Sequence, residues 1–206
     1  MAIPALIGTD IPLDETTDGV PAVVDGSDGT IYVDPDEETM ALMQEKKRAD
    51  EEKKALLQQL KGKENKTIDG KKIMLYANIG NIKDLAAVIQ NDAGGIGLFR
   101  SEFLYLEKED YPTEEEQFKV YRTAVETMAG KNVIIRTLDI GADKQCAYFN
   151  MEHEENPALG YRAIRICLTQ TDVLRHSFVR CFVQAHIGKL SIMYPMITSL
   201  WEVRKD

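Results

Sequence analysis

The chain has 206 residues, of which 44% are hydrophobic, and its formal net charge is −9. This length suits one domain or one and a piece, and the hydrophobic content is sufficient for a core, which excludes a disordered chain. The acidic balance argues against non-specific binding to nucleic acid, which depends on a basic surface. No stretch is long and apolar enough to cross a bilayer, and residues 1–8 lack the pattern of a signal peptide, so we expect a cytoplasmic protein without a membrane partner.

Residues 1–36 have the pattern of strands joined by turns. An apolar run from Val20 ends at Asp25-Gly26, and a second run follows over residues 30–33 after Ser27-Asp28-Gly29. A glycine-rich turn between two apolar runs predicts a β-hairpin. The segment is too short to form a core alone, so we expect it to be the tail of a larger domain.

Residues 37–69 change character, because a run without Gly or Pro extends to Gly62. The run is rich in Glu, Lys, Gln, Leu and Ala, which favour helix. It carries only a thin apolar stripe, formed by Leu42, Ala49, Leu56 and Leu60. We therefore predict a mostly solvated helix that links two domains.

From residue 70 to residue 206 predicted strands and helices alternate. The strands are predicted over residues 72–78, 95–98, 132–137 and 190–194. The helices are predicted over residues 84–90, 113–128, 157–168 and 171–185, with a further helix starting at Leu200. Thr113 and Glu116 have the spacing of a capping box at the start of the helix over 113–128.

This alternation predicts an α/β fold with a parallel sheet and right-handed crossovers. Four βα units correspond to half of an eight-unit barrel, so we predict a partial (β/α)8 TIM-type barrel made of its first four units. A doubly wound open sheet is the alternative. Residues 77–82, after the first strand, lack the Gly-x-Gly-x-x-Gly fingerprint common in that fold.

Two arginines follow neighbouring predicted strands at their carboxyl ends, where β/α barrels carry their active sites. Arg100 comes after the second strand, and Arg136 lies near the carboxyl end of the third. A guanidinium group donates two parallel hydrogen bonds and keeps its charge, so the pair is suited to phosphate or carboxylate. The alternative is that each arginine pairs with a nearby acid, Arg100 with Glu102 and Arg136 with Asp139. Both interpretations can hold together.

The remaining polar groups give weaker signals. The acidic loop over residues 152–157 could bind a metal ion, although such loops are more often solvated. Three cysteines without metal-binding or disulfide spacing predict reduced thiols, and three isolated histidines predict packing or surface roles. These residues are Cys146, Cys167, Cys181, His153, His176 and His186.

Several blocks of the sequence together resemble Enzyme I of the bacterial sugar phosphotransferase system, the phosphoenolpyruvate-protein phosphotransferase family. The resemblance covers essentially the whole chain, with the blocks in the family's order. The barrel blocks are residues 95–104 (GIGLFRSEFL), 112–118 (PTEEEQF), 133–144 (VIIRTLDIGADK), 155–165 (ENPALGYRAIR) and 192–197 (IMYPMI). At the front, residues 3–9 and 31–35 resemble the end of the family's phosphohistidine domain.

The resemblance implies a phosphotransferase that acts in sugar transport. In this family the barrel binds phosphoenolpyruvate and Mg²⁺, and the phosphoryl group passes to a histidine and then to the carrier protein HPr. Arg100 and Arg136 match the arginines that hold the substrate phosphate. Lys144, Glu155 and Arg162 match positions near the site, with their roles left open. The domains implied are a phosphohistidine-domain tail (1–36), a linker helix and loop (37–69) and the amino-terminal half of the barrel (70–206).

The resemblance also implies that several functional parts of the family lie outside this chain. These parts are the phosphoacceptor histidine motif upstream, and the Mg²⁺ ligands, general-acid cysteine and homodimer surface beyond Asp206. Ala142 stands where the family usually has glycine. We therefore expect a fragment that is inactive alone. The alternatives are a barrel of the pyruvate phosphate dikinase or phosphoenolpyruvate synthase type, and a non-catalytic anion-binding fragment.

Overall fold

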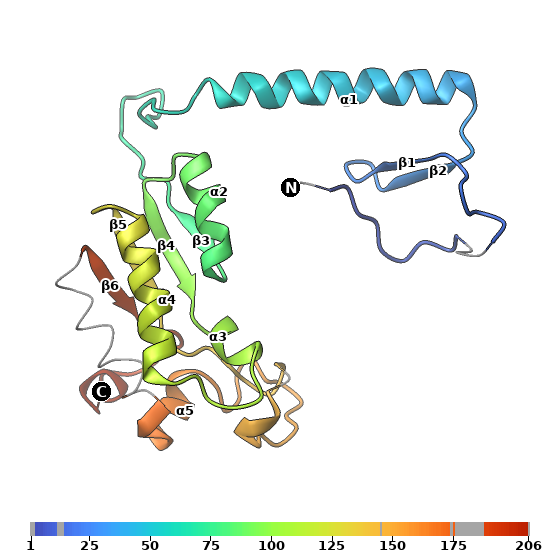
Figure 1. The fold of residues 1–206 in the computed structure, drawn as a ribbon. Helices are drawn as coiled ribbons and strands as arrows, with labels where there is room; N and C mark the ends of the chain where they lie inside the picture. Colours follow the sequence, from blue (N-terminus) through green and yellow to red (C-terminus); the bar gives the residue numbers. More distant parts are fainter. Residues whose placement is uncertain (1–2, 12–14, 145, 174, 176–187, 206) are drawn as a thin grey trace. The chain divides into compact units, whose positions relative to one another are not determined.

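The computed structural model describes residues 3–11, 15–144, 146–173, 175 and 188–205 (Figure 1). The chain divides into two compact units, Met1–Lys61 and Gly62–Asp206. The first unit holds a hairpin and one long helix, and the second holds a parallel sheet with its helices. Each unit is described by itself.

The hairpin of the first unit forms as the turn pattern predicts. Strand β1 (Ala22–Asp25) pairs antiparallel with β2 (Thr30–Val33), and Val24 lies opposite Ile31. The Asp25 side chain accepts a 2.9 Å hydrogen bond from the Ser27 amide, which stabilises the turn between the strands. The prediction of a hairpin in this segment is confirmed.

Helix α1 (Glu37–Gln58) follows the hairpin and has no buried residue. Asp36 caps its amino terminus by accepting a 2.8 Å hydrogen bond from the Thr39 amide. Lys46 donates hydrogen bonds to Asp25 and Asp28 of the hairpin turn, and these bonds raise the pKa of Lys46 above its ordinary value. The prediction of a mostly solvated helix is confirmed, and the lysine connects this helix to the hairpin.

The second unit is built on a four-stranded parallel sheet in the order β3-β4-β5-β6. The strands are β3 (Ala77–Ile79), β4 (Gly95–Arg100), β5 (Asn132–Arg136) and β6 (Leu190–Met193). Their spatial order is their order along the chain, as successive βα units require. All four carboxyl ends therefore lie at one edge of the sheet, and the predicted parallel α/β arrangement is confirmed.

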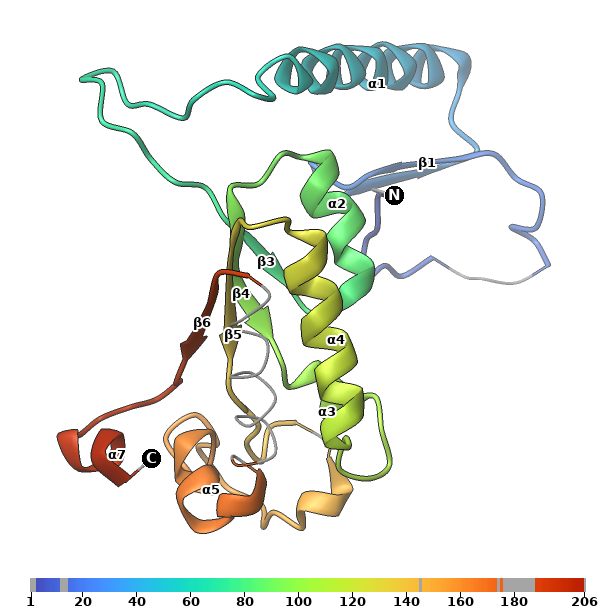
Figure 2. The ribbon, with the colours of Figure 1, turned by 60° about the vertical axis from the view of Figure 1, so that its left-hand side comes forward.

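Two helices cover one face of this sheet (Figures 1 and 2). They are α2 (Leu85–Gln90), which follows a 3-10 turn over Ile82–Asp84, and α4 (Glu114–Thr127). The buried face of α4 includes Tyr121, whose ring meets Phe99 of β4 edge-on with centroids 5.9 Å apart. The main core lies between sheet and helices and contains Ile79, Leu85, Val88, Ile96, Phe99, Tyr121, Ala124, Val125, Met128, Val133 and Ile135.

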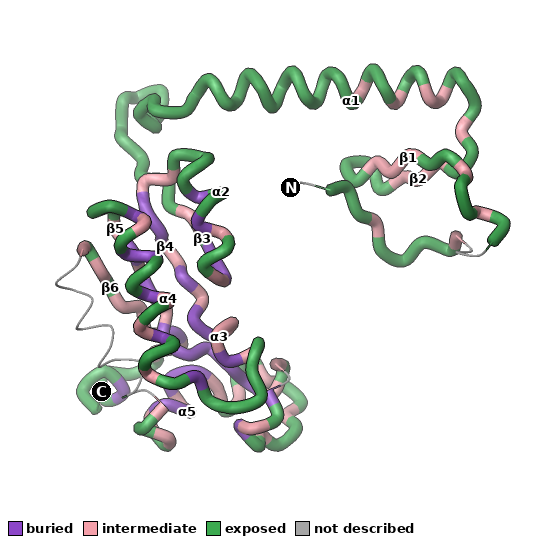
Figure 3. Tube along the Cα trace, viewed as in Figure 1, coloured by how far each residue is buried: buried purple, intermediate pink, exposed green. Residues whose placement is uncertain are grey.

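A second core lies below the carboxyl ends of the strands, among segments that Figure 3 shows as buried. It joins α3 (Phe103–Leu106), the 3-10 turn Ala147–Phe149 and α5 (Ile164–Thr169). Its members are Tyr105, Leu138, Ile140, Cys146, Phe149, Ile164, Ile166 and Cys167. This core supports the loops that follow β4 and β5.

The structure corrects three predicted elements. The first strand begins at Ala77, five residues later than predicted, and it is an edge strand with a register shift after Ala77. Helix α5 begins at Ile164 because Ala163 has a φ of 52°, outside the helical region. Helix α3 was not predicted, being a single turn.

The structure also has α7 (Leu200–Lys205), whereas most of the helix predicted over 171–185 lies outside the described residues.

The predicted capping box at α4 is present and yields a test of stability. Thr113 Oγ1 accepts from the Glu116 amide at 3.3 Å, and Glu116 accepts from the Thr113 amide at 2.8 Å. We expect Thr113→Ala to lower the free energy of unfolding by about 1 kcal/mol. Thr123→Ala, in the same helix, is the control, because alanine favours an exposed helical position. Equal losses for both variants in denaturant unfolding would contradict this role of the cap.

The same box predicts a dependence of stability on pH. Hydrogen bonds from the Lys108 side chain and from Thr113 lower the pKa of Glu116 from 4.5 to about 2. Because the folded pKa lies below the unfolded one, this contribution is complete above about pH 4.5 and is lost as the pH falls toward 2. Glu116→Gln should therefore flatten the acid decline of the unfolding free energy measured between about pH 5 and pH 2.

Glu115→Gln is the matched control for that measurement. Glu115 lies beside Glu116 in the first turn of α4 and makes a longer, 3.9 Å ion pair with Lys119. Its removal should leave the decline as steep as in the unmodified chain. A decline that is flattened equally by both variants would mean that the capping carboxylate is not the group responsible.

Candidate functional site

Arg100 and Arg136 end neighbouring strands and are register partners in the sheet. Aligned residues of adjacent parallel strands point to the same side, so both side chains leave the same face at the same edge. The structure therefore brings together the two residues that the sequence singled out. Each then meets a different environment.

Two carboxylates hold the Arg136 guanidinium. One terminal nitrogen, Nη2, donates to Glu102 Oε1, and the other, Nη1, lies 3.0 Å from Asp139 Oδ2. The arginine side chain is 16% exposed, so water screens these pairs only weakly. The predicted pairing of Arg136 with Asp139 is confirmed, and Glu102 is an additional partner that the sequence did not assign to it.

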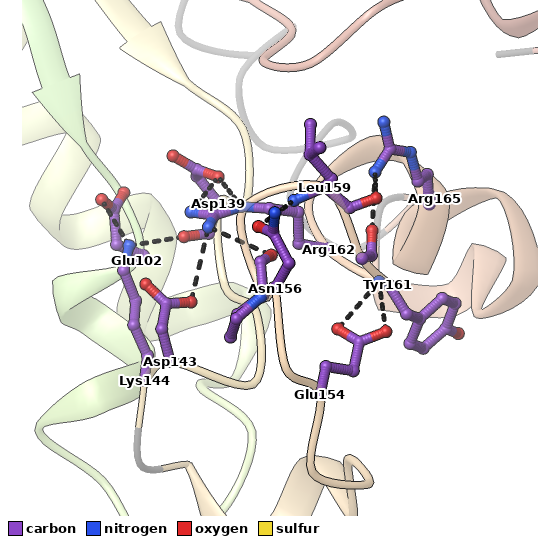
Figure 4. Close-up of polar contacts among 12 residues, drawn as sticks. Glu102, Asp139, Asp143, Lys144, Glu154, Asn156, Leu159, Tyr161, Arg162 and Arg165 are labelled. Carbon is purple, nitrogen blue, oxygen red and sulfur yellow. Dashed lines mark hydrogen bonds and ion pairs between the residues drawn. The ribbon is translucent and has the colours of Figure 1, made fainter.

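Glu102 is buried and contacts a second cation. Its side chain is 3% exposed, and Oε1 lies 3.2 Å from Lys144 Nζ, as Figure 4 shows. Lys144 also donates a 2.5 Å hydrogen bond to the Asp139 carbonyl oxygen. The suggested pair between Arg100 and Glu102 is therefore wrong, because Glu102 turns toward the end of β5 and pairs with Arg136 and Lys144 there.

Asp139 connects Arg136 with a further arginine. Arg162 donates from Nε and Nη2 to Asp139 Oδ1 at 3.1 and 3.0 Å, and its Nη1 lies 3.4 Å from Asp143 (Figure 4). Arg162 lies in the loop before α5 and not in a helix as predicted. Arg162 thus belongs to the charged cluster at the strand ends, near the site, where the resemblance also placed it. The members of this cluster are Glu102, Arg136, Asp139, Asp143, Lys144 and Arg162.

Glu155, which the resemblance also placed near the site, is exposed. Its neighbour Glu154 instead holds the loop by accepting hydrogen bonds from the Tyr161 amide at 2.9 and 3.1 Å (Figure 4). Arg165 donates to the carbonyl oxygens of Leu159 and Gly160, which stabilises the same loop. These contacts explain why residues 157–163 form a structured loop.

Arg100 differs from the other cations because no ion pair joins it to any residue that the structure describes. Its guanidinium carbon lies 4.8 Å from the centre of the Phe103 ring, a cation–π contact that sequence reasoning missed. Its Nε is buried and has no hydrogen-bond partner among the described residues. This arginine therefore keeps hydrogen-bonding capacity for a ligand.

Three other buried polar atoms at this edge of the sheet also lack a hydrogen-bond partner among the described residues. They are Arg136 Nε, Glu102 Oε2 and Thr137 Oγ1. Unpaired buried polar atoms are costly, so a group of them at one place indicates that something else satisfies them. Two free donors on neighbouring arginines match the oxygens of a phosphate or carboxylate.

The described residues do not form a metal centre. They contain no group of three or more histidine, cysteine or acidic side chains placed to hold a metal ion. Glu102 and Asp139 face arginine and lysine, which compete with a cation for their oxygens. Mg²⁺ therefore remains a prediction from the family resemblance.

The other candidates from the sequence remain separate from this site. Cys146 and Cys167 are free and buried in the second core, and His153 is exposed. Cys181, His176 and His186 lie outside the described residues. No helix in the described ranges has the length and hydropathy needed to cross a membrane.

Comparison with known proteins identifies the family of this chain. Residues 54–206 match the profile of the PEP-utilising enzymes, in their PEP-binding domain. Proteins named phosphoenolpyruvate-protein phosphotransferase from Staphylococcus carnosus and Staphylococcus aureus are 45% identical over 99% and 100% of this chain. The protein of that name from Priestia megaterium is 44% identical over 100% of the chain. In each case the match spans 36% of the relative's length. The chain therefore belongs to the family of PEP-utilising enzymes, as its sequence motifs predicted.

Proposed function

We propose that this chain is the phosphate-binding part of a phosphotransferase that passes the phosphoryl group of phosphoenolpyruvate to a protein histidine and on to HPr in the sugar phosphotransferase system. One observation carries the proposal, namely that Arg100 and Arg136 are register partners at the carboxyl ends of adjacent parallel strands. The family membership and the names of the relatives support phosphoenolpyruvate as the substrate.

The two arginines would perform different parts of this task. Phosphoryl transfer depends mainly on positioning and on neutralising charge on the transferred group. Arg100, which forms no ion pair with a carboxylate of the described residues, would supply most of the uncompensated positive charge to the phosphate oxygens. Arg136 keeps its buried Nε–H free while Glu102 and Asp139 hold its terminal nitrogens, so it would act as a fixed donor.

The remaining parts of the proposal concern the whole protein. We propose that the four-stranded sheet is the first half of a (β/α)8 barrel and that residues 1–36 are the tail of a phosphohistidine domain. The parallel strand order supports the barrel. Mg²⁺ bound by residues outside this chain and a homodimer belong to the same proposal and rest on the family resemblance. A cytoplasmic location is also proposed, and it rests on the sequence pattern.

A chimaera tests the function. This chain would replace the matching segment of the Staphylococcus carnosus relative, and HPr phosphorylation from phosphoenolpyruvate would be measured. We expect the chimaera to be active, and Arg100→Ala and Arg136→Ala each to lower kcat/KM by roughly 100-fold or more, the scale for removing one donor to developing charge.

Arg122→Ala is the matched control, because Arg122 lies on the exposed side of α4 in an i,i+4 pair with Glu126. This variant should keep the activity of the chimaera. Full activity of either Arg100→Ala or Arg136→Ala would refute the phosphate clamp. A chain that binds phosphoenolpyruvate but gives a chimaera unable to phosphorylate HPr would favour the anion-binding alternative.

A further inference from the structure

We propose that Glu102 is a positioning residue, which holds Arg136 and Lys144 in the orientation that binds the phosphoryl group of the substrate. This inference rests on the proposed function. It concerns how the cations are held, and it assigns a role to a buried carboxylate that does not itself contact the substrate.

The contacts of Glu102 join two separate segments of the chain. Its Oε1 meets Arg136 at the end of β5 and, at 3.2 Å, Lys144 in the following loop. The backbone of Glu102 belongs to the turn after β4, so one oxygen connects this turn with both cations. With Asp139 on the other terminal nitrogen, the plane of the Arg136 guanidinium is held from two sides.

Simple stabilisation does not account for this arrangement. A buried ion pair is often no more stable than apolar side chains of the same size, because desolvation offsets the Coulombic attraction. Glu102 is 3% exposed, and its Oε2 has no hydrogen-bond partner among the described residues. Because burying this carboxylate costs desolvation free energy, we infer that its role is to orient Arg136 and Lys144.

Charge neutralisation alone makes the opposite prediction. If Glu102 only reduced the positive charge, its replacement by a neutral residue would leave a more positive site, and an anion would bind more tightly. If Glu102 orients the cations, the same replacement would release Arg136 and Lys144 and weaken binding. The sign of the change therefore separates the two roles.

The test uses Glu102→Gln in the full 206-residue chain and two readouts. The first is the side-chain Nε–H signal of Arg136 in NMR, assigned by its loss in Arg136→Lys. We expect a protected, slowly exchanging signal in the unmodified chain and loss of that protection in Glu102→Gln. The second is the Kd for phosphoenolpyruvate, which should rise by roughly 10-fold or more, the scale typical of residues that orient a ligand-binding group.

Two further variants complete the design. Glu107→Gln removes one carboxylate from the exposed end of α3 and should change neither readout. Glu102→Asp keeps the charge but is too short to reach both cations, so we expect an intermediate loss of affinity. If Glu102→Gln fails to fold, Glu102→Asp decides the question by the same two readouts.

Unchanged or tighter binding by folded Glu102→Gln, with the Arg136 signal still protected, would overturn the positioning role. An unmodified chain that does not bind phosphoenolpyruvate would count against the phosphate clamp of the proposed function. In that case the NMR signal of Arg136 alone tests the positioning role of Glu102. A signal that stays protected in Glu102→Gln would refute that role.

Discussion

The pairing of β4 with β5 is the constraint on which the site depends, because its register, which shifts between Ile96 and Phe99, places Arg100 directly beside Arg136. Like charges on directly opposite residues of neighbouring strands destabilise a sheet. The fold must offset this repulsion. It does so unequally, with two carboxylates against Arg136 and an aromatic ring against Arg100. The result is one fixed cation and one that keeps most of its charge available.

This asymmetry decides what the cluster can do. This edge carries four cations, Arg100, Arg136, Lys144 and Arg162, and three carboxylates, Glu102, Asp139 and Asp143. The carboxylates all pair with the last three cations, so the uncompensated charge falls at Arg100. A chain that is strongly acidic as a whole can in this way present a local site for an anion, because the position of each charge matters more than the net charge.

The sequence predicted those features that depend on local pattern. The strands that carry Arg100 and Arg136 were predicted from their apolar runs to within two residues of their observed ends, and the cap at Thr113 follows from its spacing to Glu116. The partners of Glu102 could not be predicted from local pattern. Glu102 follows β4, but it pairs with Arg136 at the end of β5 and with Lys144 in the loop after β5. The loop before α5 was mistaken for a helix. Side-chain hydrogen bonds that the residue pattern does not reveal hold it open, since the Tyr161 amide donates to Glu154 and Arg165 donates to the Gly160 carbonyl oxygen.

The second core explains why the carboxylates are fixed. Asp139 lies between Leu138, 2% exposed, and Ile140, which is fully buried. These two side chains belong to the second core, whereas the Asp139 carboxylate between them pairs with Arg136 and Arg162. The Ile140 carbonyl also accepts a 3.1 Å hydrogen bond from the Ala163 amide, which brings Arg162 to the same carboxylate. The apolar contacts of the second core therefore support the geometry of the charged side chains at the strand ends. A cavity made in this core would disturb the arginines although none of the substituted residues contacts them.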